Sequence, residues 1–304
     1  MKNKAKFAVL GGDFRQYAAA LELSRKGICV YANGLSVDKS DQKDIKFCED
    51  IAQALSDADA VVLPLPASVD GIVLNCPGYR NSERVSLEKI IDLMGDKSLL
   101  FGGRIPQYTV DKAKEKGIKV FDYFLSEKLQ IKNAYITAEA AVSIAMNSLD
   151  KCVRDANFAI TGSGRISRLL ADLLRRMGAR VTVCARNADS LVYFELLGCD
   201  TLLIAQDEHK QKWYRALESG YDVIYNTVPS WLFDREFLEH IDKKLLFIEL
   251  ASAPGGVDIC AARELGSNVL WASSLPGKYA PHSAGVLIAQ CIEEILYDEG
   301  VEFL

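Results

Sequence analysis

The sequence predicts an α/β protein built from two parallel-sheet domains. Two stretches resemble each other, "FAVLGGDFR" at 7–15 and "FAITGSGRI" at 158–166, and each is typical of a short strand, a glycine turn and a helix. Apolar strand-like runs then alternate with helix-length segments, which is the pattern of a parallel sheet covered on both faces. A chain of 304 residues suits two such domains. We therefore expect two Rossmann-like parallel-sheet domains joined by a long helix, with a C-terminal helix returning across the domain boundary.

The first domain is expected over residues 1–136 as an α/β substrate-side domain. A helix from Phe14 to Lys26 ends at Gly27, because glycine accepts the left-handed conformation that stops a helix. The remaining elements follow in order: the strand "ICVYA", a helix containing Ile51 and Leu55, the strand "AVVLPLP", a helix ending near Gly95, the strand "SLLFGG", a helix ending at Gly117 and the strand "IKVFDY".

The segment 137–152, "TAEAAVSIAMNSLDKC", is expected to be the connecting helix, with Thr137 as its cap. The second domain follows over 153–282. Ser283 is expected to cap a returning helix, "AGVLIAQCIEEIL", within 283–304. The cleft between two such domains is the default ligand site.

The glycine turn of the second domain has the context of a dinucleotide site. A strand at 158–161 leads to Gly162 and Gly164, then a helix, a stop at Gly178 and the strand "RVTVCAR". Gly162 can make the tight turn, and Gly164 lets the backbone approach a pyrophosphate. The residues expected to hold the pyrophosphate at the helix N-terminus are Gly162, Ser163, Gly164, Arg165 and Ile166. Ser167 replaces the third glycine of the pattern. A purely structural turn is the alternative.

Arg186 stands where an NAD site usually places an acid for the ribose 2′-hydroxyl. A cation suits a 2′-phosphate, so the predicted cofactor is NADP. The alternative is a solvent-facing arginine. The first domain's "GGDFRQ" is not expected to be a second dinucleotide site, because Asp13 lies where the phosphate would sit.

Composition excludes several classes of protein. The net charge of −5 gives no basic footprint for nucleic acid, and no apolar run is long enough to span a membrane. The eight cysteines form no C-x-x-C pair, which favours reduced thiols and a cytoplasmic protein over a disulfide framework. The three histidines lie far apart, so no metal site is expected.

Several motifs are spread over essentially the whole chain: "VLGGDFRQ", "AVVLPLP", "TAEAAVSIAM", "TGSGRIS", "VCAR", "NTVP", "ELASAPGGVD" and "LPGKYAPHSAG". Together they resemble the A-subunit family of dipicolinate synthase. This resemblance implies an NADP-linked oxidation of 2,3-dihydrodipicolinate, or of its hydrated precursor, to dipicolinate. It also implies the cytoplasm of the mother cell of a sporulating bacterium. The implied partner is the flavoprotein-like B subunit of dipicolinate synthase, and a homo-oligomer is compatible with the sequence.

A dicarboxylate substrate needs cations, and arginine pairs with carboxylates in a bidentate way. Arg15 and Arg104 both follow predicted strand ends, where open α/β sheets bind ligands, although either could instead form a salt bridge. The loop after "YDVIY" holds Thr227, Val228 and Pro229, and we expect it beside the nicotinamide.

The C-terminal motifs supply the other candidates. Lys278 could hold a carboxylate or transfer a proton, and His282 could act as the base. Ser283 could bind an anion or only cap its helix, and Glu249 could be the base or a satisfied strand-end acid. Gly255 and Gly256 are expected to need unusual backbone angles. Two competing functions remain: an NADP-binding regulatory subunit, and an amino-acid or 2-hydroxyacid dehydrogenase of similar layout.

Overall fold

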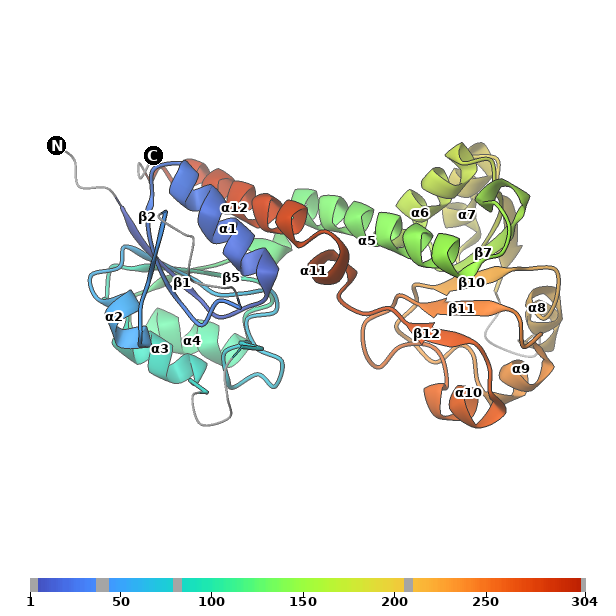
Figure 1. Ribbon diagram of the computed structural model, residues 1–304, viewed down its shortest axis with the longest axis horizontal. Helices are drawn as coiled ribbons and strands as arrows, with labels where there is room; N and C mark the ends of the chain where they lie inside the picture. The colour runs from blue at the N-terminus through green and yellow to red at the C-terminus, as the bar shows by residue number, and fades with distance from the viewer. Residues whose placement is uncertain (1–4, 37–43, 79–83, 205–209, 302–304) are drawn as a thin grey trace. The chain divides into compact units, whose positions relative to one another are not determined.

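The computed structural model describes residues 5–36, 44–78, 84–204 and 210–301, and it divides into two compact units (Figure 1). Unit 1 comprises Met1–Asn133 with Ala280–Leu304, and unit 2 comprises Ala134–Tyr279. Each unit contains one six-stranded parallel sheet with helices on both faces. The predicted fold class, two Rossmann-like α/β domains, is confirmed.

The sheet of unit 1 has the strand order β3-β2-β1-β4-β5-β6. This order places a topological switch point at β1, where an open α/β sheet binds its ligand. The strands are β1 (Lys6–Leu10), β2 (Cys29–Asn33), β3 (Ile45–Phe47), β4 (Ala60–Val62), β5 (Leu99–Gly102) and β6 (Lys119–Asp122).

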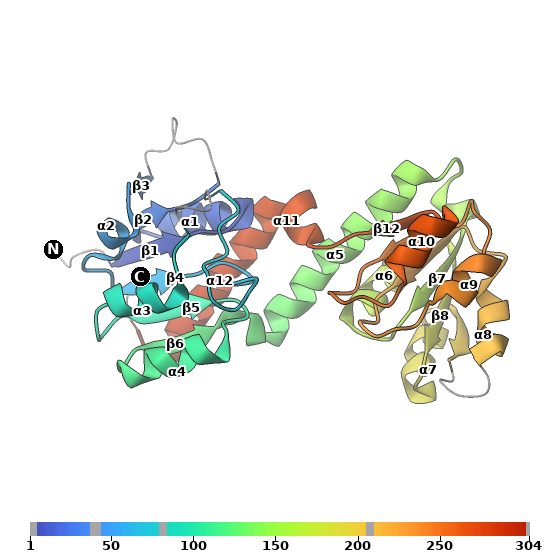
Figure 2. The same cartoon turned by 90° about the horizontal axis from the view of Figure 1, so that it is seen from below.

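Alternate residues of these strands face two separate cores, as the two-residue period of a strand requires. On one face α1 (Phe14–Arg25) and α12 (Pro281–Asp298) lie side by side (Figure 1). They pack so closely that a Cβ at Gly285 would clash with the Arg15 carbonyl oxygen. The other face is covered by α2 (Ile51–Leu55), α3 (Leu87–Leu93) and α4 (Gln107–Glu115), of which α3 and α4 lie in front of the strands in Figure 2. A short 3-10 helix, η2 (Tyr123–Leu125), follows β6.

The sheet of unit 2 repeats this arrangement with the order β12-β11-β10-β7-β8-β9, so its switch point lies at β7. Its strands are β7 (Asn157–Thr161), β8 (Arg180–Ala185), β9 (Asp200–Leu203), β10 (Val223–Asn226), β11 (Leu246–Glu249) and β12 (Val269–Trp271). One face packs against α5 (Glu127–Ser148), α6 (Arg165–Arg176) and α7 (Ala188–Leu196). The other packs against α8 (Lys210–Leu217), α9 (Arg235–His240) and α10 (Ile259–Leu265), and the short α11 (Leu275–Tyr279) follows β12.

Two predicted helix boundaries are wrong. The connecting helix predicted over 137–152 runs instead over Glu127–Ser148, because Ser126 Oγ accepts the Leu129 amide and starts it earlier. Thr137 is therefore a buried residue inside α5 and not its cap. The final helix begins at Pro281, since proline is favoured in the first turn, and Ser283 lies inside α12 without a capping bond.

All eight cysteines are free thiols. Cys48, Cys184, Cys199 and Cys291 are buried, whereas Cys152 and Cys260 are exposed. Within the described ranges, no helix is both long and apolar enough to pass through a bilayer, and no cluster of three His, Cys, Asp or Glu side chains could bind a metal ion.

Candidate functional site

The glycine turn after β7 has a geometry that requires glycine at its first position. Gly162 has φ = +102°, and a Cβ there would clash with Thr227 Oγ1. Its amide donates to the Cys184 carbonyl of the neighbouring strand β8 at 2.8 Å. The turn therefore passes tightly under the loop after β10, and any side chain at this residue would displace that loop.

The next residues of the turn form an open cradle for an anion. Gly164 is the N-cap of α6 without a side-chain capping bond, and a Cβ built on it meets no atom within 4 Å. Among the described residues, the amides of Ser163, Gly164 and Ile166 donate to no acceptor. Open amides of this kind and the positive end of a helix, here α6 with 12 residues, are groups that suit an anion such as a pyrophosphate.

Ser167, which replaces the third glycine of the pattern, is buried, and its hydroxyl forms a hydrogen bond. Its Oγ lies 2.8 Å from Thr227 Oγ1, which in turn donates to the Thr161 carbonyl at 2.8 Å. These hydrogen bonds tie the first turn of α6 to the loop that holds Thr227, Val228 and Pro229. The departure from the glycine pattern therefore joins two parts of the site.

Arg186 directly follows β8 and is exposed. In the part of the chain that the structure describes, its guanidinium forms neither an ion pair nor a hydrogen bond. Asn187 next to it uses its side chain to cap α7, accepting the Asp189 amide at 2.8 Å. Arg186 is therefore available to a ligand on the β8 side of the glycine turn.

Glu249, the last residue of β11, has no exposed surface. Its carboxylate accepts from Asn226 Nδ2 at 2.9 and 2.8 Å and from the amides of Ala251 and Gly256 at 2.8 and 2.9 Å. Burial raises the pKa of Glu249 above its ordinary value, although these hydrogen bonds lower it. A carboxylate with its lone pairs occupied and no solvent access is a satisfied strand-end acid, and the structure favours this alternative over a base.

The loop after β11 needs its two glycines for different reasons. Gly255 has φ = +80°, as expected. Gly256 does not have a positive φ, so the predicted unusual angle is not found there. Glycine is required instead for space, because a Cβ would lie 2.5 Å from Asn226 Nδ2 and 2.8 Å from the Val228 carbonyl.

In the equivalent turn of unit 1, the amides of the two glycines are already used in hydrogen bonds and are not open to an anion. The Gly11 amide donates to the Asn33 carbonyl at 2.9 Å, and the Gly12 amide donates to the Asn75 carbonyl at 2.8 Å. Asp13 caps α1 and places its negative charge at the helix N-terminus. Both features disfavour a phosphate at this turn.

The two arginines of unit 1 differ in their availability. Arg15 pairs with Asp13 through Nε and Nη2, at 2.9 and 2.8 Å, and Nη2 also donates to the Leu65 carbonyl at 2.8 Å. Only its Nη1 lacks a partner within the described ranges. Arg104 is exposed, stacks its guanidinium 5.1 Å from the Phe124 ring centroid, and forms no ion pair with a described residue.

The backbone of Arg104 is strained, with φ = +52° in the region that favours glycine. The carboxylate of Asp122 holds this conformation by accepting the amides of Arg104 and Ile105, at 3.1 and 3.0 Å. Arg15 and the loop of Arg104 both contact the segment after β4, because Arg15 donates to the Leu65 carbonyl and the Gly103 amide donates to the Pro64 carbonyl at 3.2 Å. Both arginines therefore lie at the carboxyl edge of the sheet of unit 1.

The C-terminal candidates are divided between the units. Lys278 lies in unit 2, in the exposed last turn of α11, and lines a hollow of about 280 Å³ with Asn147, Ser148 and Trp271. His282 and Ser283 lie in unit 1, exposed in the first turn of α12. Neither of these two side chains forms a hydrogen bond or an ion pair with a described residue.

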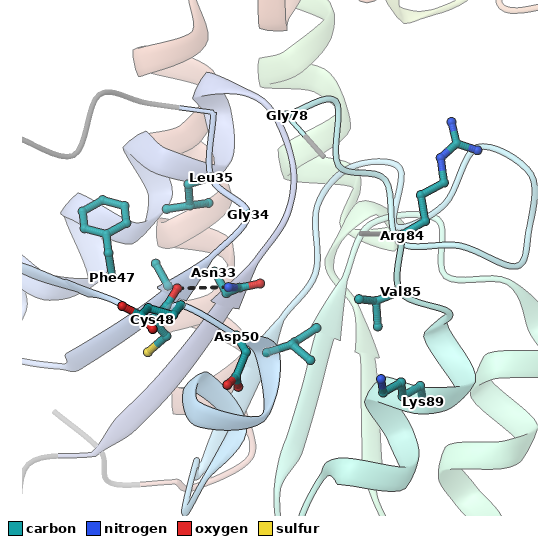
Figure 3. Close-up of a pocket in the computed structure, with 13 residues that line it drawn as sticks. Asn33, Gly34, Leu35, Phe47, Cys48, Asp50, Gly78, Arg84, Val85 and Lys89 are labelled. Atoms are coloured by element: carbon teal, nitrogen blue, oxygen red, sulfur yellow. Dashed lines mark hydrogen bonds between the residues drawn. The ribbon is translucent and has the colours of Figure 1, made fainter. Parts of the chain in front are cut away.

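Unit 1 also contains a hollow of about 600 Å³ beside the ends of β2 and β3 (Figure 3). Inside it Asn33 Nδ2 donates to the Cys48 carbonyl at 3.0 Å, and Asp50 caps α2. The guanidinium of Arg84 points away from both Asn33 and Asp50 in Figure 3. None of the residues that the sequence predicts as site residues lines this hollow.

The comparisons with known proteins agree with the resemblance seen in the sequence. Residues 6–124 match the family model of the N-terminal domain of the dipicolinate synthase A subunit. The chain is 28% identical to the A subunit of dipicolinate synthase from Bacillus subtilis (strain 168), over 96% of this chain and 95% of that protein. The resemblance is therefore confirmed over nearly the whole chain.

Solved structures also resemble this chain over nearly its whole length. The crystal structure of the A chain of dipicolinate synthase from Bacillus subtilis has a TM-score of 0.80 and 26% identity, covering 99% of each chain. An L-alanine dehydrogenase, at 14% identity and a TM-score of 0.64, covers 98% of this chain and 91% of its own, and it shows the fold alone. A D-lactate dehydrogenase from Escherichia coli, at 12% identity and a TM-score of 0.61, covers 97% of each chain and likewise shows the fold alone.

The sequence patterns did not identify Thr161 and Asn226, which are buried and bonded to each other at 2.6 Å. A signal for them exists, because each is a polar residue that ends an otherwise apolar strand. For Arg15 the sequence left a salt bridge open as the alternative, and the structure shows one with Asp13 at 2.8 Å.

Proposed function

We propose that this chain, which resembles the A subunit of dipicolinate synthase over nearly its whole length, catalyses an NADP-linked oxidation of 2,3-dihydrodipicolinate, or of its hydrated precursor, to dipicolinate. The main support is one observation on unit 2. Within the described residues, the amides of Ser163, Gly164 and Ile166 donate to no acceptor, and they lie beside β8. Arg186, which directly follows β8 and has no described partner, stands where NAD sites place an acid.

The described residues fit NADP. The amides of Ser163, Gly164 and Ile166 would hold the pyrophosphate, and Arg186 would hold the 2′-phosphate by charge-assisted hydrogen bonds. Because a dinucleotide crosses the switch point of its sheet, the nicotinamide would then lie on the β10 side, beside Thr227, Val228 and Pro229. When bound, NADP supplies the hydride acceptor.

The substrate carries two carboxylates, and unit 1 offers cations at its carboxyl edge. Arg104, whose guanidinium has no ion-pair partner among the described residues, would hold one carboxylate, and Arg15 would add its Nη1. The strained backbone of Arg104 supports this role, since strain is often kept where a side chain must be aimed at a ligand. Ser283 in the first turn of α12 and Lys278 in α11 are the proposed further contacts.

The oxidation also releases a proton, which needs only a weak base because the product is aromatic, and the hydrated precursor would in addition lose water. His282 is the proposed acceptor, and Lys278 is the alternative. Both side chains are exposed, so either can exchange its proton with water. Glu249 is not proposed, because its carboxylate is buried and fully engaged.

The proposed setting follows from the family resemblance. The chain would work with the flavoprotein-like B subunit in the cytoplasm of the mother cell during sporulation.

The test is to mix the purified chain with NADP and freshly made dihydrodipicolinate and to follow absorbance at the NADPH band. NADPH formed by the chain alone supports the proposal. Binding of NADP with turnover only after the B subunit is added would favour the regulatory function. Turnover of an amino acid or a 2-hydroxy acid in a substrate panel, but not of dihydrodipicolinate, would favour the third function.

A further inference from the structure

Three adjacent strands of unit 2 end in a row of buried polar residues. The strand register aligns Thr161 of β7 with Asn226 of β10, and Asn226 with Glu249 of β11. All three residues have no exposed surface, whereas the residues before them in these strands are mostly apolar and buried. A buried polar row is costly unless its hydrogen bonds are satisfied, so its partners indicate what it stabilises.

The hydrogen bonds of the row run in one direction. Thr161 Oγ1 donates to Asn226 Oδ1 at 2.6 Å, and Asn226 Nδ2 donates to both carboxylate oxygens of Glu249. The amides of Ala251 and Gly256 donate to the same carboxylate. Every described neighbour of Glu249 in this network is a donor, so these hydrogen bonds favour the ionised carboxylate, whereas burial opposes its charge.

The row fixes both loops on the β10 side of the glycine turn. Asn226 accepts the Val228 amide at 3.1 Å and donates to the Val228 carbonyl at 3.0 Å, which sets the path of the loop after β10. Glu249 binds the two ends of the loop after β11 through Ala251 and Gly256. The Gly256 carbonyl continues the network by accepting the amides of Leu232 and Phe233, at 2.9 and 2.8 Å.

Resting on the function proposed above, we infer that Glu249 is a positioning residue for the nicotinamide end of the dinucleotide. Arg186 lies on one side of β7, on β8, and the two loops that Glu249 fixes lie on the other side, after β10 and β11. A dinucleotide that crosses the switch point places its adenosine on the first side and its nicotinamide on the second. Glu249 therefore acts on one half of the cofactor through backbone that it holds, without touching the ligand.

The experiment compares two ligands that differ only at the nicotinamide end. Wild type, Glu249→Gln and Thr161→Val are titrated by calorimetry with NADP and with 2′-phospho-ADP-ribose, which lacks the nicotinamide. Glu249→Gln keeps the shape of the side chain but turns an amide donor toward the donors of Asn226, Ala251 or Gly256. Thr161→Val removes the donor at the other end of the row. Glu239→Gln makes the same chemical change on an exposed part of α9 and is the matched control.

Glu249→Gln should raise the dissociation constant of NADP about tenfold and that of 2′-phospho-ADP-ribose less than about twofold. Thr161→Val should shift the two constants in the same pattern by a smaller factor, and Glu239→Gln should shift neither. Thermal unfolding of each variant identifies any that fail to fold, and Thr161→Val is then the test of the row. Equal weakening of both ligands, or no weakening of NADP, in a folded variant overturns the inference.

The same titration separates this inference from the proposed function. A wild-type chain that binds neither ligand contradicts the proposed cofactor site and the inference together. A wild-type chain that binds both ligands equally well makes no use of the nicotinamide end, and this result overturns the inference while leaving the 2′-phosphate site in place.

Discussion

The side-chain amide of Asn226 lies 2.9 and 2.8 Å from the two carboxylate oxygens of Glu249, in a part of unit 2 with no solvent exposure. These two residues end neighbouring strands in direct register. Burial of the carboxylate disfavours its charged form, and the surrounding donors favour it. The result is a pKa of Glu249 that lies above its ordinary value of 4.5.

This raised pKa predicts a pH dependence of stability. Because the pKa is higher in the folded chain than in the unfolded chain, the contribution of Glu249 is fully present below about pH 4.5 and is lost as the pH rises through the folded pKa. Glu249→Gln does not titrate. The free energy of unfolding of wild type minus that of Glu249→Gln should therefore fall as the pH rises above about 4.5 in urea titrations. A difference that is constant or rises with pH contradicts the prediction.

The strands and glycine turns of the fold could be predicted from the sequence, since apolar runs and glycines are local signals. Both switch-point turns carry such signals. The strands β3, β9 and β12 carry weaker signals, because each lies at an edge of its sheet and has partly exposed residues. The starts of α5 and α12 differ from the prediction because Ser126 and Pro281 compete with Thr137 and Ser283 for the first turn.

The candidate site was predictable where one residue acts alone and was not where partners are distant in sequence. Arg186 and Gly162 have the expected environment because strand, turn and helix follow each other. The partners of Glu249 are 23 residues away at Asn226 and seven residues away at Gly256, and only the register of β10 and β11 unites them. Arg15 alone suggests a substrate contact, but Asp13 holds its Nε and Nη2.

Arg186→Asp should weaken NADP far more than NAD. The change removes the partner of the 2′-phosphate and adds a repelling charge, and a hydrogen bond to a charged group contributes about 1.5–3 kcal/mol. We expect the dissociation constant of NADP to rise at least about tenfold, with a change of less than about threefold for NAD. Both are measured by calorimetric titration.

Arg180→Asp is the matched control, because Arg180 is an exposed arginine at the opposite end of the same strand β8. It should leave the ratio of the two constants unchanged. An equal loss for NADP and NAD in Arg186→Asp would show that Arg186 does not select the cofactor.

Valine at the two glycines of the turn should have different effects. At Gly164 the side chain enters open space, so the fold should survive while NADP binding is lost, because the pyrophosphate would occupy the same volume. At Gly162 the same side chain would meet Thr227 on a left-handed backbone, so the chain should be destabilised. Thermal unfolding and an NADP titration of both variants check this. Unchanged NADP affinity in Gly164→Val would mean that the turn is only structural.

Arg104→Ala should weaken dipicolinate and leave NADP unaffected. Truncation removes a charge-assisted pair with a carboxylate, about 1.5–3 kcal/mol, and so should raise the dissociation constant of dipicolinate roughly ten- to a hundredfold. The fold should tolerate the change, because the guanidinium is exposed and Asp122 binds only the backbone at this residue. NADP is expected in unit 2, which holds the open glycine turn, so its affinity should stay within about twofold.

Arg168→Ala provides the matched control for Arg104→Ala. The guanidinium of Arg168 lies 5.1 Å from the Tyr193 ring centroid, as that of Arg104 lies 5.1 Å from the Phe124 ring centroid, so the same kind of aromatic contact is lost. Arg168 belongs to α6 in unit 2, and its truncation should leave dipicolinate binding unchanged. Both variants are titrated with dipicolinate and with NADP. Normal dipicolinate binding by Arg104→Ala, or an equal loss of both ligands, would remove Arg104 from the substrate site.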